Sequence, residues 1–250
     1  MITAKQREEV RAEITACCRQ MMLSRRIVEL CEQEATPKQE EFLHRVLTEE
    51  VAAREKSRRQ RLMQRAGLPV YKTFEDYDFR GIKFPAALTR EELTSCSFVA
   101  EKKNLVLFGP VGTGKTHLAI ALGVKACEQG LNTKFASVTE MVLRLAEARR
   151  AGTLERLVRE LQKLDLLILD EWGYVPVDKE GSQLLFRVIA DSYESKSLIL
   201  TTNLEFSKWG SIFTDDQMAA AMIDRLAHHG HLLLFEGASY RMKHALTRQK

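Results

Sequence analysis

What this 250-residue chain lacks already narrows its class. Its apolar runs, such as residues 166–169, are far shorter than the about 20 residues that a membrane-spanning helix needs. Residues 1–13 carry charges and no apolar stretch, so we expect no secretory signal. The five cysteines are odd in number and form no Cys-x-x-Cys pair, which indicates free thiols in a reducing cytoplasm. These absences predict a soluble, cytoplasmic protein without a membrane partner.

The composition is that of an ordinary globular protein. Hydrophobic residues make up 45% and charged residues 29%, which is too apolar for a disordered chain and sufficient for a real core. The length suits one large domain, or a medium domain with a small one. A net charge of +4 permits a nucleic-acid partner without requiring one, so the position of the positive charges matters more than their sum.

The first 66 residues have a helical pattern and no strand pattern. Apolar residues between positions 14 and 31 recur at the spacing of one helix face. A further helix is expected to begin at Pro37, because Thr36 can cap it and Gln39 completes a capping box. A glycine and a proline at positions 67 and 69 end it. We therefore expect a small all-α domain over residues 1–66 and a second domain over residues 67–250.

From residue 104 onward, short β patterns alternate with helical ones. The expected strands cover residues 104–108, 134–138, 165–169, 197–201 and 231–235. The expected helices cover residues 115–128, 139–150, 153–163, 180–195 and 215–228. This alternation predicts an α/β domain, with a parallel five-stranded sheet flanked by helices on both faces.

One segment fits the phosphate-binding loop pattern in full. It follows the first expected strand and opens a helix, which is the context that supports such a match. Glycines let backbone N–H groups converge on phosphates, and the helix N-terminus adds a positive field. We expect Lys115 to reach the β and γ phosphates of ATP and Thr116 to bind Mg²⁺, the alternative being a glycine-rich turn without a ligand. The expected ATP-binding residues are Gly109, Pro110, Val111, Gly112, Thr113, Gly114, Lys115 and Thr116.

Two acids follow a buried apolar strand. Asp170 and Glu171 come directly after residues 166–169, at the end of a strand where α/β sheets bind ligands. Asp170 is expected to hold Mg²⁺, and Glu171 to orient and polarise the attacking water. The alternative is a buried strand that ends in a solvated acidic turn.

Another apolar strand, at 197–201, ends in small polar residues. If it lies between the phosphate-loop strand and the Asp170 strand, Asn203 faces the γ-phosphate and can hold the attacking water together with Glu171. A polar strand end that caps the next turn is the alternative.

These three elements, in this order, resemble Walker A, Walker B and sensor 1 of AAA+ ATPases. The resemblance implies that Arg225 is an arginine finger that completes a neighbouring subunit's site. The alternative is a surface arginine paired with Asp224. Arg241 lies in a segment that resembles the closing Gly-x-Ser-Tyr-Arg motif of one AAA+ branch, where it either senses the nucleotide or packs the last strand. Because only nine residues follow it, the usual helical lid is expected to be absent.

Two further segments each allow two interpretations. Residues 71–79 resemble the segment that lies beside the adenine in this family, and their aromatic side chains either pack on the base or begin the domain core. Residues 139–163 carry five arginines, mixed with Glu147, Glu155 and Glu160. Their placement resembles the nucleic-acid-facing insertion of initiator relatives, whereas the mixed charge equally suits a solvated face.

The end of the N-terminal helical region is strongly basic. Arg54, Arg58, Arg61 and Arg65 are spaced by four, three and four residues, which puts them on one helix face. The stripe is about 16 Å long and can reach several phosphates of one DNA strand. A solvated charge run is the alternative. The expected DNA-binding residues are Arg54, Lys56, Arg58, Arg59, Arg61 and Arg65.

Nearly the whole chain resembles the IstB branch of DnaC-like AAA+ proteins, the ATPase helpers of insertion-sequence transposition. The most specific likeness is the run Asp-Glu-Trp-Gly-Tyr-Val-Pro at residues 170–176, together with residues 203–210 and 224–229. At position 172 this chain has a tryptophan where the family more often has leucine.

The resemblance implies a mechanism. ATP would drive assembly of a homo-oligomer on double-stranded DNA, the assembly would recruit the transposase of the same element, and hydrolysis would time disassembly. A replicative helicase loader of the DnaC kind is the nearest alternative. A small-molecule P-loop kinase and a non-catalytic clamp that uses ATP only to close are alternatives from other classes.

Overall fold

The computed structural model describes residues 3–75, 77–173, 178–210 and 215–240. The chain divides into two compact units, Met1–Arg61 and Leu62–Lys250. The division falls inside helix α3 (Pro37–Ala66), a few residues before the boundary expected from the sequence. Across the described residues, we find no helix both long and apolar enough to cross a bilayer.

The first unit is helical, as expected. It contains α1 (Ala4–Gln20), α2 (Arg26–Glu34) and most of α3. Helix α3 begins at Pro37, where the backbone N–H of Thr36 donates to the Gln39 side chain at 2.8 Å. The buried apolar residues of this unit are Ile14, Cys18, Met21, Cys31 and Leu47.

A buried ion pair also holds the first unit together. The carboxylate of Glu40 is only 1% exposed and accepts from Arg7 at 2.8 Å and from Arg11 at 2.7 Å. These hydrogen bonds, the one from Arg7 above all, hold the pKa of Glu40 below its ordinary value. The carboxylate therefore stays ionised and ties the start of α3 to α1.

The second unit is built on a six-stranded sheet with the order β1-β6-β2-β5-β4-β3. Five strands are parallel: β2 (Asn104–Phe108), β3 (Thr133–Ser137), β4 (Leu166–Trp172), β5 (Ser197–Thr202) and β6 (Gly230–Phe235). The sequence prediction missed β1 (Ile82–Lys83), which pairs with β6 in the antiparallel sense. Two residues are too few to produce a readable periodicity.

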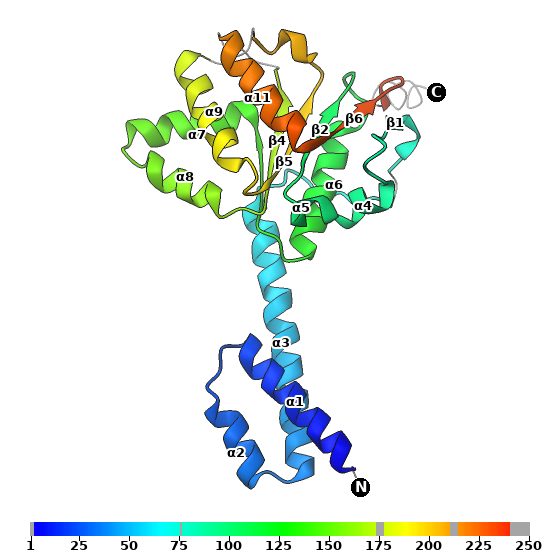
Figure 1. Cartoon of the computed structure of the whole chain (residues 1–250), viewed down its shortest axis with the longest axis vertical. Helices are drawn as coiled ribbons and strands as arrows, with labels where there is room; N and C mark the ends of the chain where they lie inside the picture. The colour runs from blue at the N-terminus through cyan, green and yellow to red at the C-terminus, as the bar shows by residue number, and fades with distance from the viewer. Residues whose placement is uncertain (1–2, 76, 174–177, 211–214, 241–250) are drawn as a thin grey trace. The chain divides into compact units, whose positions relative to one another are not determined.

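Helices cover both faces of this sheet. Figure 1 shows α7 (Val138–Arg150), α8 (Leu154–Gln162) and α9 (Lys179–Ser192) on one side of the strands, and α4 (Arg90–Ser95), α5 (Ser97–Ala100) and α6 (Lys115–Glu128) on the other. Successive side chains of a strand point to opposite faces. Leu167 and Leu169 of β4 accordingly join the core with α7 and α9, and Ile168 joins the core with α6.

The remaining elements are shorter or follow β5. The 3₁₀ turn η1 (Phe79–Gly81) precedes β1, and η2 (Phe206–Lys208) follows β5. Helix α11 (Asp216–His228) then leads into β6 and packs against α9. The α/β architecture expected from the sequence is thus confirmed, with one additional edge strand.

Candidate nucleotide site

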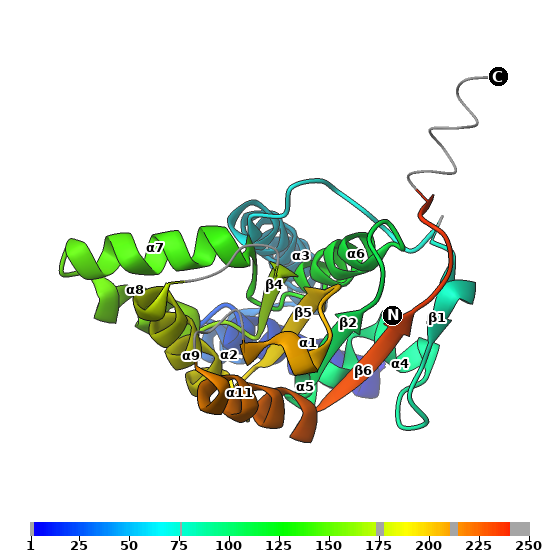
Figure 2. The ribbon, with the colours of Figure 1, turned by 90° about the horizontal axis from the view of Figure 1, so that it is seen from above.

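The strand order brings three sequence elements to one edge of the sheet. Strand β5 lies between β2 and β4, which is the arrangement on which the interpretation of Asn203 depended. Figure 2 shows β4, β5, β2 and β6 side by side in this order. Because parallel strands end at the same edge, the loop after β2, the acids of β4 and the polar end of β5 are neighbours.

The phosphate-binding loop joins β2 to α6, and two of its glycines are required by close packing. Gly109 has a φ of +153°, and a side chain there would collide with the backbone of Phe235 in β6. Gly112 has a φ of +80°, and a side chain there would collide with Ser239. Beside that contact, the backbone N–H of Tyr240 donates to the carbonyl of Gly112 at 2.9 Å. The segment after β6 therefore packs directly on the loop.

Lys115 lies where a phosphate-binding lysine is expected, at the start of α6. Its side chain is buried, and its ammonium group donates to the carbonyls of Gly109 and Pro110, both at 2.7 Å. A buried ammonium group needs such partners. To bind a phosphate, Lys115 would have to give up these two carbonyls.

Thr116 and Asp170 are in direct contact. The Thr116 hydroxyl donates to Asp170 Oδ1 at 3.0 Å, and the Thr201 hydroxyl donates to the same oxygen. Asp170 is buried. Hydroxyl and carboxylate oxygens are the ligands that Mg²⁺ prefers, usually together with waters and substrate phosphates. Among the described residues, no group of three His, Cys, Asp or Glu side chains is placed to hold a metal ion.

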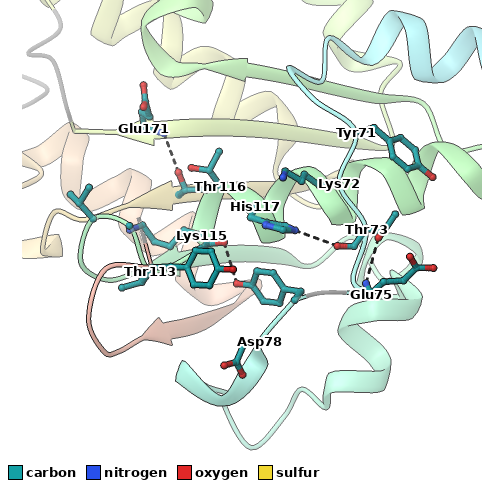
Figure 3. Close-up of a pocket in the computed structure, with 16 residues that line it drawn as sticks. Tyr71, Lys72, Thr73, Glu75, Asp78, Thr113, Lys115, Thr116, His117 and Glu171 are labelled. Carbon is teal, nitrogen blue, oxygen red and sulfur yellow. Dashed lines mark hydrogen bonds between the residues drawn. The ribbon is translucent and has the colours of Figure 1, made fainter. Parts of the chain in front are cut away.

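Glu171 has an unusual backbone for a strand residue. Its φ is +63°, and the pairing of β4 with β5 shifts register between Leu169 and Trp172. Its backbone N–H donates to the Thr201 hydroxyl at 3.0 Å. Glu171 is exposed and lines the cavity described below. Figure 3 shows its carboxylate directed away from Thr116 and Lys115.

A cavity of about 730 Å³ opens beside the loop (Figure 3). This volume is in the range of a small-molecule site. The segment that follows α3 forms one wall, and the phosphate-binding loop forms the other. The lining residues are Tyr71, Lys72, Thr73, Glu75, Tyr77, Asp78, Val111, Gly112, Thr113, Gly114, Lys115, Thr116, His117, Glu171, Thr201 and Tyr240.

The aromatic residues of the segment 71–79 support both earlier interpretations, some facing the cavity and others joining the domain core. Tyr71 and Tyr77 line the cavity, whereas Phe74 and Phe79 belong to the core beside α6. The Tyr77 hydroxyl donates to the carbonyl of Gly114 at 3.1 Å. Its ring packs edge-on against the ring of His117, with the two ring centres 5.0 Å apart. Burial lowers the pKa of His117 and so favours the neutral ring at the cavity wall.

Asn203 and Arg225 do not line this cavity, and neither do the expected site residues Gly109, Pro110 and Asp170. Asn203 is exposed, directly after β5. Arg225 lies on α11, half-buried, where it donates to the carbonyl of Ala221 at 2.9 Å and its guanidinium lies 5.3 Å from the centre of the Phe186 ring. Arg241 lies outside the described residues.

The sequence interpretation assigned no role to Thr201 or to Tyr240. Both line the cavity, and Thr201 contacts both acids of β4. The signal for Thr201 was present, since small polar residues end the β5 pattern. That pattern could not decide which of them faces the site, because the register of β5 against β4 is a property of the folded sheet.

The six basic residues expected to bind DNA are all exposed on α3. Two of them form ion pairs one turn away on the same helix, Arg54 with Glu50 at 2.7 Å and Arg59 with Glu55 at 3.7 Å. Exposed pairs of this kind are worth well under about 1 kcal/mol, so a phosphate could replace the glutamate at small cost.

Two of the five arginines of α7 and α8 form ion pairs with acids. Arg149 pairs with Glu180 of α9 at 3.3 Å, and Arg156 pairs with Glu160 at 3.1 Å. From the other side, Arg187 of α9 pairs with Glu155 at 2.7 Å. These contacts tie the helix pair to α9, which suits the interpretation of a mixed, solvated face.

Comparisons with known proteins agree with this architecture. A family described as "IstB-like ATP binding protein" matches residues 22–248. The chain is 40% identical to the ATP-binding protein of insertion sequence IS21 of Pseudomonas aeruginosa, over 81% of this chain and 77% of that one. It is 38% identical to the ATP-binding protein of insertion sequence IS5376 of Geobacillus stearothermophilus, over 81% of each chain.

Solved structures show the same fold at lower identity. The DnaC helicase loader matches 66% of this chain and 96% of its own length, with a TM-score of 0.52 and 23% identity. AMPPCP-bound DnaA of Aquifex aeolicus matches 73% of this chain and 55% of its own, with a TM-score of 0.54 and 20% identity. The fold is therefore that of the AAA+ P-loop ATPases, and the chain belongs to the family of IstB-like ATP-binding proteins.

Proposed function

We propose that this protein is a Mg²⁺-dependent ATPase that assembles on double-stranded DNA and acts with the transposase of an insertion sequence. One observation supports the ATPase part above the others. The Thr116 hydroxyl and the Asp170 carboxylate, from two distant parts of the sequence, meet at 3.0 Å beside the cavity that Lys115 lines. In this proposal the magnesium site and the phosphate site are adjacent.

In this proposal each side chain has a distinct task. Backbone N–H groups of the loop and the Lys115 ammonium group bind the phosphates, while Thr116 and Asp170 hold Mg²⁺. The metal neutralises charge that develops on the transferring phosphoryl group. Glu171 accepts a proton from the attacking water and orients it, and Asn203 holds that water from the neighbouring strand end. The Glu171 side chain is exposed, and its rotation would bring the carboxylate over the cavity.

Arg225 fits a role in a neighbouring subunit's site. It lies on α11 and does not line its own cavity among the described residues. Within the described residues its guanidinium lies near the Phe186 ring and forms no ion pair, so it can be offered to a phosphate on another copy. This argues for a homo-oligomer, a ring or a spiral, in which each site is completed by the next protomer. Arg241 is proposed only as an additional nucleotide contact.

Duplex DNA is proposed to bind along the basic part of α3. The six exposed cations lie between residues 54 and 65, where Glu55 is the one acid in the sequence, and such a stripe matches the charge of a phosphate backbone. The transposase partner is inferred from the relatives, which are named as ATP-binding proteins of insertion sequences. A helicase loader remains the second candidate, because the DnaC helicase loader shares the fold.

The experiment that separates these two candidates is sedimentation of the protein with duplex or single-stranded DNA, with and without Mg-ATP. Large ATP-dependent assemblies on the duplex are expected. Preference for single strands, or no DNA binding without a helicase, would overturn the duplex assembly and favour the loader.

A further inference from the structure

The conformation of Glu171 requires an explanation, because it is a charged, non-glycine residue in the left-handed region inside a strand. That region costs an L-residue roughly 1–2 kcal/mol. The residue sits where β4 shifts register against β5, the pattern of a β-bulge. Bulges next to active sites commonly re-aim a side chain.

The bulge changes the relative directions of two adjacent acidic side chains, those of Asp170 and Glu171. In a regular strand, consecutive side chains point to opposite faces of the sheet. With Asp170 pointing to Thr116, a regular β4 would direct Glu171 to the opposite face. The left-handed residue breaks this alternation, and Glu171 lines the same cavity as Thr116 and Lys115, with its carboxylate directed away from them in Figure 3.

One side chain contacts both acids across the gap between β4 and β5. The Thr201 hydroxyl donates its proton to Asp170 Oδ1 and accepts the backbone N–H of Glu171 at 3.0 Å. A hydroxyl is the smallest group that can donate in one direction and accept in another. Thr201 is buried, so loss of its oxygen would leave the Glu171 N–H without this acceptor.

The far side of the bulge is held by a different set of contacts. Trp172 is buried and packs on Trp209, with ring centres 5.0 Å apart. Its carbonyl accepts from the Thr202 hydroxyl at 2.9 Å. These are the two tryptophans of the chain, so tryptophan emission reports on the residue next to Glu171.

We propose that Thr201 is a positioning residue that holds the left-handed kink at Glu171, and thereby keeps the water-activating acid at the same cavity as the magnesium-binding acid. This inference rests on the proposed ATPase function. Thr201 acts through the Glu171 backbone and through Asp170, and it takes no proton from water itself. Without its hydroxyl, β4 relaxes toward a regular strand and Glu171 turns toward the other face.

Two substitutions at this position separate the hydroxyl from the shape of the side chain. Thr201→Val keeps the volume and removes both hydrogen bonds, whereas Thr201→Ser keeps the hydroxyl and removes a methyl group. For Thr201→Val we expect kcat for ATP hydrolysis to fall about tenfold or more, with the dissociation constant for ATP within about threefold of the wild type. Thr201→Ser is expected to keep kcat within about threefold.

A second measurement does not depend on hydrolysis. Relaxation of the bulge moves Trp172 against Trp209, so the tryptophan emission of Thr201→Val should shift from that of the wild type, while Thr201→Ser should match it. The proposal is overturned if Thr201→Val keeps the wild-type kcat and emission, or if Thr201→Ser falls as far as Thr201→Val. If the wild type itself hydrolyses no ATP, the proposed function fails, and the emission comparison still decides whether Thr201 holds the kink.

Discussion

The basic stripe on α3 makes a quantitative prediction about salt. Each phosphate neutralised on B-DNA contributes about 0.9 to the slope of log affinity against log salt concentration. If Arg54, Arg58, Arg61 and Arg65 each contact one phosphate, replacing all four with alanine should flatten that slope by about 3.6. Raising the salt from about 50 to about 200 mM should then weaken wild-type binding about 100-fold more than binding by the variant.

The assay is fluorescence anisotropy with a short duplex, measured across a salt series with Mg-ATP present. A matched control removes four exposed arginines from the other candidate surface, Arg144, Arg149, Arg156 and Arg159 on α7 and α8. This control should keep the wild-type slope, because the arginines of α7 and α8 stand among Glu147, Glu155 and Glu160, whereas the basic part of α3 contains one acid, Glu55. An unchanged slope in the α3 variant, or a flattened slope in the control alone, would refute the assignment of α3.

Three further predictions follow from the site and the first unit. Glu171→Gln should bind ATP with near wild-type affinity, hydrolyse it on the order of 100-fold more slowly, and stay on duplex DNA in a dissociation assay; release at the wild-type rate would contradict the timer role. Arg225→Ala should be inactive alone. Mixing it with the slow Glu171→Gln should restore part of the phosphate release, because some interfaces then join an intact Glu171 to an intact Arg225. No recovery at any mixing ratio would argue against an arginine finger supplied by a neighbouring subunit. Glu40→Gln should lower the stability of the first unit by about 1–3 kcal/mol at pH 7, measured by thermal melting. Since the folded pKa of Glu40 is lowered, its contribution is complete above the unfolded pKa and is lost as pH falls through the folded value. The wild type should therefore approach the variant in acid, and a difference that persists unchanged there would count against this account.

The sequence predicted the architecture well where patterns are long or chemically specific. The five parallel strands were placed to within a few residues. Four of them, β2, β4, β5 and β6, carry at least three consecutive apolar residues, as buried strands of a parallel sheet do, whereas β3 carries only Phe135 and Ala136. Helix α3 begins at Pro37 as expected, since proline is favoured at the first helical position. Thr116 and Asp170 were each expected to bind Mg²⁺, and in the structure their side chains meet at 3.0 Å.

What the sequence could not provide depends on register and on partners. The expected strand at 165–169 continues to Trp172 in the structure, through the bulge at Glu171. No periodicity predicts a bulge, because it is set by pairing with β5. The contacts of Tyr240 with Gly112 join residues more than a hundred positions apart. The role of Arg225 depends on a second copy of the chain and stays a prediction.

The central claim is that the cavity beside Lys115 binds ATP with Mg²⁺ and hydrolyses it. Its most direct test is the rate of phosphate release from ATP in the presence of duplex DNA, together with equilibrium binding of ATP, for the wild type and for Lys115→Ala. We predict Mg²⁺-dependent hydrolysis by the wild type, and a variant that binds ATP about tenfold or more weakly and releases no phosphate above background. Hydrolysis by Lys115→Ala at the wild-type rate, or a wild type that neither binds nor hydrolyses ATP, would contradict the account.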